Sequence, residues 1–287
     1  MPNSTTFPTR NRPFNNLSIH ASNRIFRLLI ASMFATATFA HDLYILPQSF
    51  GVEAGARVTV GFHNGDSFPE SEVAPTIARL KTAQLLSAFG GVPIDDLKVE
   101  GNRATGVVMV PDHKGTMILS VETVPNFIEL EPEKFIEYLK EEGMEHVIEW
   151  RSQHGEASKP GRERYSKFAK SLITSGSPDE FYNHTFGFPI EIIPDANPAA
   201  LRAGRELPVR IMFRGKPASN LQVEAAWATA EQKKTTVIGR TDANGRIRVP
   251  INAAGKWRLH SLVMERCQEP AAADWESFWA SLTFEIR

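Results

Sequence analysis

Short stretches of alternating apolar and polar residues recur along the N-terminal part of the chain. Residues 57–62 and 105–110 alternate with period two, and residues 116–122 follow a turn-like cluster of polar residues and glycine. Period two places successive side chains on opposite faces of an extended strand. We therefore predict a β-sandwich over residues 41–125. Within it, the pattern of 77–87 fits either a helical turn or a strand.

The same alternation returns more clearly in the C-terminal part of the chain. The strands predicted there are 189–194, 207–213, 221–227, 246–249, 255–262 and 281–286. About six or seven short strands separated by turn residues are typical of an immunoglobulin-like or transthyretin-like sandwich. Residues 188–287 are predicted to form this second β domain.

The middle segment has a helical pattern instead. Pro132 stands near a first helical turn, where its missing N–H costs nothing, and apolar residues follow at near-helical spacing. Gly143 is expected to divide this stretch in two, and a further helix is predicted over 163–173. The predicted fold class is therefore mainly β, with two immunoglobulin-like or transthyretin-like sandwiches and a helical insert and linker at 126–187 between them.

The first 40 residues resemble a secretory signal peptide. Arg24 and Arg27 supply positive charge, residues 28–34 form an apolar run, and the pattern Thr38-Phe39-Ala40 suits signal cleavage. The run is shorter than the roughly 20 residues that a membrane span needs. We expect cleavage after Ala40 and a periplasmic or secreted product. The polar residues before Arg24 leave the true start of translation open.

Charge and cysteine content narrow the function classes. The first 40 residues contain four arginines and no acidic residue, so their removal takes the formal charge from −1 to about −5. The mature chain has no basic run, which argues against a nucleic-acid partner. It also has no apolar stretch that predicts a membrane span. Cys267 is the only cysteine, so no intramolecular disulfide can form.

Catalytic motifs are missing from the sequence. It contains no Gly-x-Ser-x-Gly elbow, no His-Glu-x-x-His zinc helix and no phosphate-binding glycine loop. The surroundings of Cys267 are acidic, which does not favour a reactive thiolate. We therefore predict a protein that binds rather than catalyses.

His41 is the first candidate for chemistry. After cleavage it offers an α-amino nitrogen and an imidazole from one residue, which together can grip a nickel, cobalt or copper ion. Asp42 is expected to orient the ring by accepting a hydrogen bond from it. The third residue of the mature chain is Leu43, so the amino-terminal motif with a third-position histidine is absent. The alternative interpretation is that His41 has no role in metal binding and is only the residue that follows the cleavage site.

Other candidate metal ligands are spread along the chain. His63 and Asp66 lie at a predicted strand end and turn, where ligands are often presented, and Glu70 follows in the same loop. His260 lies on the strand at 255–262, where a structural role is the alternative. His184 lies between the two predicted β domains, where it could complete a site between them.

Several longer motifs resemble a bacterial secreted family. They are AHDLYILP at 40–47, EKFIEYLKEEGM at 133–144, RERYSKFAKSL at 162–172, ADWESFWASLTFEI at 273–286, and the segment that begins PIEIIPDANP at 189. The chain resembles the family described as domain of unknown function 4198 over nearly all of its mature length. This resemblance implies a periplasmic component associated with nickel and cobalt uptake, with a membrane metal importer as partner. It also supports His41, because the family often begins with His-Asp at this point.

Two other functions remain open at this stage. A structural or interaction module that binds protein or carbohydrate would have separated histidines and an exposed aromatic or apolar patch. A copper redox enzyme would need an open coordination position beside the His41 amine and a second histidine. A metal-binding protein is the leading hypothesis.

Overall fold

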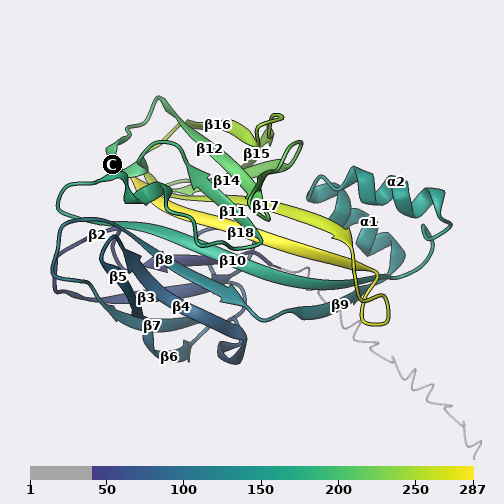
Figure 1. Cartoon of the computed structure of the whole chain (residues 1–287), viewed down its shortest axis with the longest axis horizontal. Helices are drawn as coiled ribbons and strands as arrows, with labels where there is room; N and C mark the ends of the chain where they lie inside the picture. The colour runs from purple at the N-terminus through teal and green to yellow at the C-terminus, as the bar shows by residue number, and fades with distance from the viewer. Residues whose placement is uncertain (1–40) are drawn as a thin grey trace, which may run out of the picture. The chain divides into compact units, whose positions relative to one another are not determined.

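The computed structural model describes residues 41–287 (Figure 1), so the predicted signal peptide at 1–40 lies outside the described residues. Strands dominate this part of the chain and form three sheets. The largest is ten-stranded, with β2 (Gly51–Val52) and β9 (Asn126–Leu130) both paired to β10. Its path in spatial order is β15 (Lys233–Arg240), β14 (Gln222–Ala228), β17 (Gly255–Arg266), β18 (Trp275–Ile286), β10 (Gly161–Ser175), β8 (Gly115–Thr123), β4 (Leu80–Ser87) and β5 (Gly90–Pro93).

Two smaller sheets complete the β structure. The N-terminal one has the order β1 (Leu43–Pro47), β3 (Arg57–Asn64), β7 (Arg103–Met109) and β6 (Asp95–Glu100). The C-terminal one has the order β11 (Ile190–Pro194), β12 (Arg205–Phe213) and β13 (Lys216–Pro217), with β16 (Arg246–Ile251) also on β12. Short 3₁₀ turns lie at Ile77–Arg79, Glu180–Asn183 and Pro198–Ala200.

Each small sheet packs on a different part of the large one. Side chains of β1, β3 and β7, such as Phe62, form one buried core with those of β4, β8 and β10, such as Leu119. Side chains of β11, β12 and β16, such as Ile211, form another with those of β14, β17 and β18, such as Trp257. The predicted mainly-β fold with packed sheets and a helical insert is therefore confirmed. The predicted domain boundaries stay a prediction. Strands from both predicted β domains belong to one sheet.

The insert contains two α-helices rather than three. They are α1 (Pro132–Glu141) and α2 (Glu145–Gln153), and Gly143 separates them at φ +67°, a left-handed conformation that glycine adopts without a Cβ clash. Phe135 and Leu139 of α1 are fully buried against Trp279 and other residues at one end of β17 and β18. The helices therefore cover the end of the large sheet beside β9, as Figure 1 shows.

The helix predicted over 163–173 is wrong, because this segment is the long strand β10. β10 pairs in parallel with β18 and in antiparallel fashion with β8, so it lies inside the sheet and is covered on both faces. Its central lysines, Lys167 and Lys170, are buried as deeply as its apolar residues. That burial removes the alternation by which a half-exposed strand is recognised. Residues 77–87 form a 3₁₀ turn followed by β4, so this stretch contains both a helical turn and a strand.

A buried carboxyl on β10 gives a testable pH dependence. Burial raises the pKa of Glu163 to about 7, although hydrogen bonds from Ser277 and Tyr138 oppose this. Ionisation of Glu163 therefore costs more in the folded chain than in the unfolded one, where the pKa is near 4.5. Native stability from this group falls as pH rises from about 4.5 to about 7.

Glu163→Gln cannot ionise, so the variant should escape this loss. Its free energy of unfolding, relative to that of the unchanged protein, should rise by about 2–3 kcal/mol between pH 4.5 and pH 8. Urea denaturation of both proteins at these two pH values measures the difference. An unchanged difference at the two pH values would show that this carboxyl does not titrate as its burial implies.

Candidate functional site

The loop that follows β3 folds back on itself. Asn64 accepts hydrogen bonds at its backbone carbonyl from the N–H groups of Glu72 (3.0 Å) and Val73 (3.1 Å), which closes the loop at its base. Phe68 anchors the loop in the protein, since its ring is 2% exposed and lies 5.4 Å from that of Tyr44. The segment between these points is therefore held in a defined shape.

Close packing at Gly65 brings the two ends of this loop together. A Cβ at this position would lie 2.9 Å from the backbone nitrogen of Glu72 and 3.1 Å from the carbonyl oxygen of Glu70. The N–H of Gly65 also donates to the carbonyl of Asp42, at 3.0 Å. The absence of a side chain here lets residues 66 and 72 approach one another beside the start of β1.

The product of this folding is a cluster of His41, Asp66 and Glu72. The Nδ1 atom of His41 lies 3.0 Å from Oδ2 of Asp66 and 3.6 Å from Oε2 of Glu72. One potential ligand atom from each residue lies within 4.8 Å of the others, and no other such group of three occurs in residues 41–287. The imidazole is 14% exposed, while the carboxylates of Asp66 and Glu72 are open to solvent.

Backbone hydrogen bonds to one oxygen of Glu72 favour its charged form and leave the other oxygen without a backbone donor. Its Oε1 accepts hydrogen bonds from the backbone N–H groups of Asp66 (3.0 Å) and Ser67 (3.1 Å). Partial burial would raise the pKa of Glu72, but these hydrogen bonds and the nearby His41 lower it overall. Oε2 then remains to face the imidazole.

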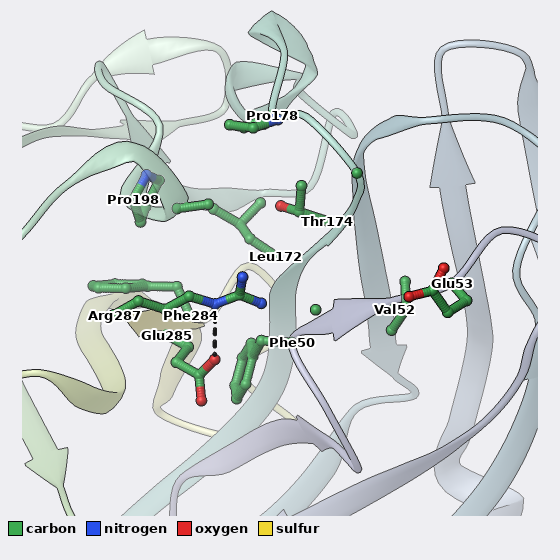
Figure 2. A pocket seen from close by; sticks show the side chains of 13 residues that line it. Phe50, Val52, Glu53, Leu172, Thr174, Pro178, Pro198, Phe284, Glu285 and Arg287 are labelled. Atoms are coloured by element: carbon green, nitrogen blue, oxygen red, sulfur yellow. Dashed lines mark ion pairs between the residues drawn. The ribbon is translucent and has the colours of Figure 1, made fainter.

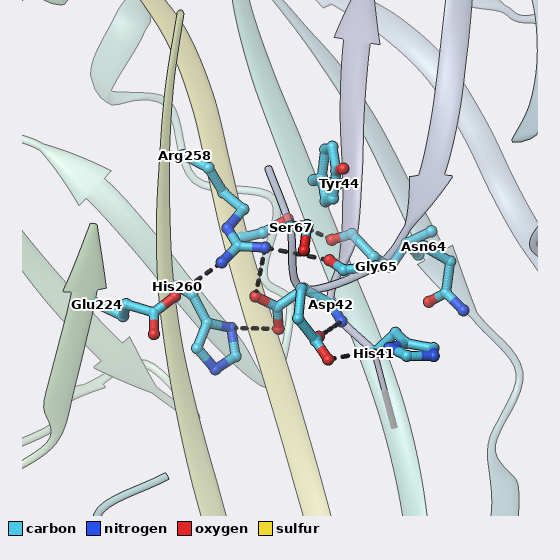
Figure 3. A network of polar contacts seen from close by, with 12 residues as sticks. His41, Asp42, Tyr44, Asn64, Gly65, Ser67, Glu224, Arg258 and His260 are labelled. Carbon is cyan, nitrogen blue, oxygen red and sulfur yellow. Dashed lines mark hydrogen bonds and ion pairs between the residues drawn. The ribbon is translucent and has the colours of Figure 1, made fainter. Parts of the chain in front are cut away.

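Ion pairs fix the residue next to His41. Figure 3 shows Asp42 between Arg258 and His260, two side chains of β17. Its Oδ2 lies 2.8 Å from Nη1 of Arg258, and its Oδ1 lies 2.9 Å from Nδ1 of His260. Burial alone would raise the pKa of Asp42, but both cations outweigh it and hold the pKa well below its usual range. The hydrogen bond expected between Asp42 and the His41 ring is replaced by the contact with Asp66.

His260 serves as a double donor in this network. Its Nε2 lies 3.0 Å from Oε2 of Glu142, so both ring nitrogens face carboxylates. Burial would lower the pKa of His260, but Asp42 and Glu142 raise it well above its usual value. An imidazolium has no free lone pair for a metal ion. In this protonated form His260 positions the neighbour of His41 and does not ligate.

Hydrogen bonds also fix the first residues of β1 to the large sheet. The hydroxyl groups of Ser281 and Thr283, both on β18, donate to the carbonyls of Leu43 (2.6 Å) and Ile45 (2.5 Å). The Nζ of Lys167, on β10, donates to the carbonyl of His41. Burial lowers the pKa of Lys167 to about 8, against the opposing effect of Asp42. The backbone of His41 is therefore positioned from several strands.

Two further candidate ligands lie outside the cluster. His63 points away from the adjacent Asn64 and stacks on Tyr44, with ring centroids 5.3 Å apart. Burial, together with the charges of Arg103 and Lys256, lowers its pKa to about 4, so this ring is neutral at neutral pH.

His184 stacks on a phenylalanine instead. Its ring lies 4.8 Å from that of Phe181 and meets Phe186 edge-on at 5.6 Å. Neither it nor His63 joins the three-residue cluster of the described chain.

The structure also adds a residue that the sequence did not single out. Glu72 takes the place expected for Glu70, whose carboxylate instead lies 3.1 Å from Nζ of Lys233. Both acids follow the same turn, and nothing in their spacing distinguishes them. Only the closure of the loop at Gly65 decides which one meets His41.

The donor set suits a borderline transition metal ion. One imidazole and two carboxylates offer nitrogen and oxygen ligands, and none of the three residues offers sulfur. Such ligands fit nickel, cobalt, zinc or Cu(II) and do not fit the soft Cu(I) ion. Nδ1, the ring nitrogen nearest the backbone of His41, is the atom that faces the carboxylates. It is also the nitrogen that can close a chelate ring with an α-amine on the same residue.

A cavity at the far end of β10 offers a contrast. It encloses about 350 Å³ and is bordered by Phe50, Thr174 and Arg287, which Figure 2 shows. The Nε of Arg287 lies 3.6 Å from Oε2 of Glu285, so the arginine at this cavity already has a carboxylate partner. Among the described residues that line this cavity, none is a histidine or cysteine.

No described helix has the length and apolar character needed to cross a membrane. A comparison with curated proteins finds no match. Among solved structures, the D0-D1 domain of intimin is 14% identical, with 86% of this chain and 99% of that chain covered and a TM-score of 0.21.

Two further adhesins are similar at the same level. InvE from Yersinia pseudotuberculosis is 15% identical, with 85% of this chain and 58% of that chain covered and a TM-score of 0.22. FdeC from Escherichia coli is 14% identical, with 84% and 65% covered and a TM-score of 0.25. This chain therefore spans less than two thirds of either adhesin.

A family model matches residues 38–265, which include the cluster at His41 and the network around Asp42. The match extends over most of the chain and confirms the resemblance found in its motifs. The chain belongs to the family described as domain of unknown function (DUF4198).

Proposed function

We propose that this chain, once it begins at His41, is a secreted, non-catalytic protein that binds a transition metal ion in the periplasm. The ion is nickel, cobalt or copper, and the protein passes it to a membrane importer. The resemblance described above associates the family with nickel and cobalt uptake, and the leader pattern supports the location.

One observation carries the proposal. His41 Nδ1, Asp66 and Glu72 converge at the residue that the cleavage pattern makes the new N-terminus. Removal of residues 1–40 would add an α-amine to this set, which would give two nitrogen and two oxygen donors. Binding would replace the Nδ1 proton that Asp66 now accepts. The ring and the carboxylates would hold the ion, while Asp42 and Lys167 would keep the backbone of His41 in place.

An interaction module remains the second candidate function. The placement of His63, His184 and His260 outside the cluster is the separation of histidines that this alternative predicts. Phe89, at the turn between β4 and β5, is 79% exposed and is the most exposed of the large apolar side chains described. Metal titration decides between the two functions.

Two carboxylate variants test the proposed site. Asp66→Asn and Glu72→Gln keep the side-chain shape but each remove a charged oxygen ligand. Each should weaken Ni(II) affinity at least about tenfold. Isothermal titration calorimetry of the chain 41–287 with Ni(II) measures the change.

Glu70→Gln is the matched control, because Glu70 lies in the same loop and contacts Lys233 rather than His41. Its Ni(II) affinity should equal that of the unchanged chain. Equal affinities in all three variants would place any bound metal elsewhere. No binding to the unchanged chain would reject the metal function and favour the interaction module.

A further inference from the structure

A cavity beside His41 is rich in hydrogen-bond donors and has no acidic wall. It encloses about 340 Å³ between residues 73–76, the strand β9 and the side chains of β10. Its polar lining includes His41, Arg79, Lys167, Asn126 and Tyr165, and no Asp or Glu is among the described residues that line it. This volume suits a small organic molecule.

The two cations of this cavity have no carboxylate partner among residues 41–287. Arg79 donates from Nη1 to the hydroxyl of Tyr165 and from Nη2 to the carbonyl of Val124, both at 3.3 Å, and its buried Nε has no partner in the described chain. Lys167 is 6% exposed and donates to neutral oxygens of Asn64 and His41. Asp42, Asp66 and Glu163 act on Lys167 only from beyond ion-pair distance, so an anion in this cavity would stabilise the two cations further.

Tyr165 lies next to both cations. Its ring centroid is 5.1 Å from the guanidinium carbon of Arg79 and 5.3 Å from Nζ of Lys167. Its hydroxyl oxygen accepts N–H bonds from Arg79 and from Asn126, the latter at 2.8 Å. No described residue accepts the proton of this hydroxyl, so it is available to a ligand.

Most of the other lining residues are apolar, although Asn64, Thr76 and Thr123 also contribute. Two of its large apolar side chains, Phe127 and Val73, are 54% and 44% exposed. The apolar lining residues are Leu43, Val73, Ala74, Pro75, Leu80, Phe127 and Ile128. A purely inorganic anion would leave this surface uncovered, whereas an anion with an apolar body would cover it.

We propose that this cavity binds a small organic carboxylate, with its charged end at Arg79, Lys167 and Tyr165 and its apolar body against Phe127 and the neighbouring wall. An arginine matches the two oxygens of a carboxylate with two parallel N–H donors. His41 also lines this cavity and Lys167 donates to its carbonyl, so the test below is made in excess chelator, without bound metal.

Titration with three anions tests the proposal. The chain 41–287 in excess chelator is titrated with hexanoate, acetate and inorganic phosphate by calorimetry. Hexanoate should bind, and acetate should bind at least about tenfold more weakly, because it lacks the methylene groups that would cover the wall. Absence of hexanoate binding, or tighter binding of phosphate than of hexanoate, would overturn the proposal.

Variants locate the site. Arg79→Gln and Tyr165→Phe should each weaken hexanoate binding, the first at least about tenfold. Lys256→Gln is the control, since this cation lines a different cavity with His63 and Arg103. Circular dichroism checks that each variant is folded. If Arg79→Gln does not fold, Tyr165→Phe still tests the site, because it removes only one oxygen atom. Unchanged affinity in a folded Arg79→Gln or Tyr165→Phe protein would contradict the assignment.

Discussion

Asp42→Ala should lower the free energy of unfolding by about 3–5 kcal/mol. The carboxylate is 8% exposed and pairs with Arg258 and His260, whose side chains are 2% and 6% exposed. Its removal leaves two buried cationic groups without their shared anion. It also removes one of the contacts that hold the start of β1, although Lys167, Ser281 and Thr283 still bind the backbone there. Chemical denaturation of the variant and the unchanged chain measures the loss.

An exposed ion pair provides the control for this prediction. Asp96 and Arg57 lie 2.8 Å apart, but their side chains are 65% and 64% exposed. Asp96→Asn removes this charge, and asparagine tolerates the left-handed φ of 54° at this position, so stability should change by less than about 1 kcal/mol. A loss of that small size in Asp42→Ala would mean that the buried network does not fasten β1.

His41→Ala should reduce Ni(II) affinity at least about 100-fold, the largest effect of any single substitution on binding. The change removes the only imidazole of the cluster, and it leaves two carboxylates whose ordering depends on the loop rather than on His41. Replacement of a residue that only orients a ligand already costs about 10–100-fold in typical metal sites, so loss of a direct nitrogen ligand should cost at least as much. Calorimetric titration measures the affinity.

One control removes a histidine outside the cluster, and a second blocks the α-amine of His41 while it keeps the ring. His63→Ala removes a buried histidine outside the cluster and should leave Ni(II) affinity unchanged in the folded protein. A chain that retains Ala40 blocks the α-amine of His41 but keeps its ring, and it should bind more weakly than the chain that begins at His41. Equal affinity in the His41→Ala and unchanged proteins would remove His41 from the site.

Most strands could be predicted from the sequence, including the buried β8, β17 and β18, whereas β10 could not. Residues 57–62 alternate and lie within β3, whereas β10 carries lysines at buried positions and resembles a helix in sequence. Lys170 is tolerated there because its Nζ lies 2.9 Å from Oε2 of Glu191, a residue distant in sequence. Such pairing depends on the tertiary structure and leaves no local pattern.

The candidate site shows the same division. His41 and Asp66 could be selected from the sequence because one follows a cleavage pattern and the other follows a turn. Glu72 could not, since its choice over Glu70 depends on the contact at Gly65. The roles of Asp42 and His260 depend on the approach of β17 to the start of β1, which joins residues more than 200 positions apart.

The most direct test of the metal site is a crystal structure of the chain 41–287 grown with Ni(II), with diffraction recorded on both sides of the nickel absorption edge. We predict an anomalous peak bounded by the His41 imidazole, the His41 α-amine and the carboxylates of Asp66 and Glu72. A peak at another histidine, or no peak in crystals that contain nickel, would contradict this prediction.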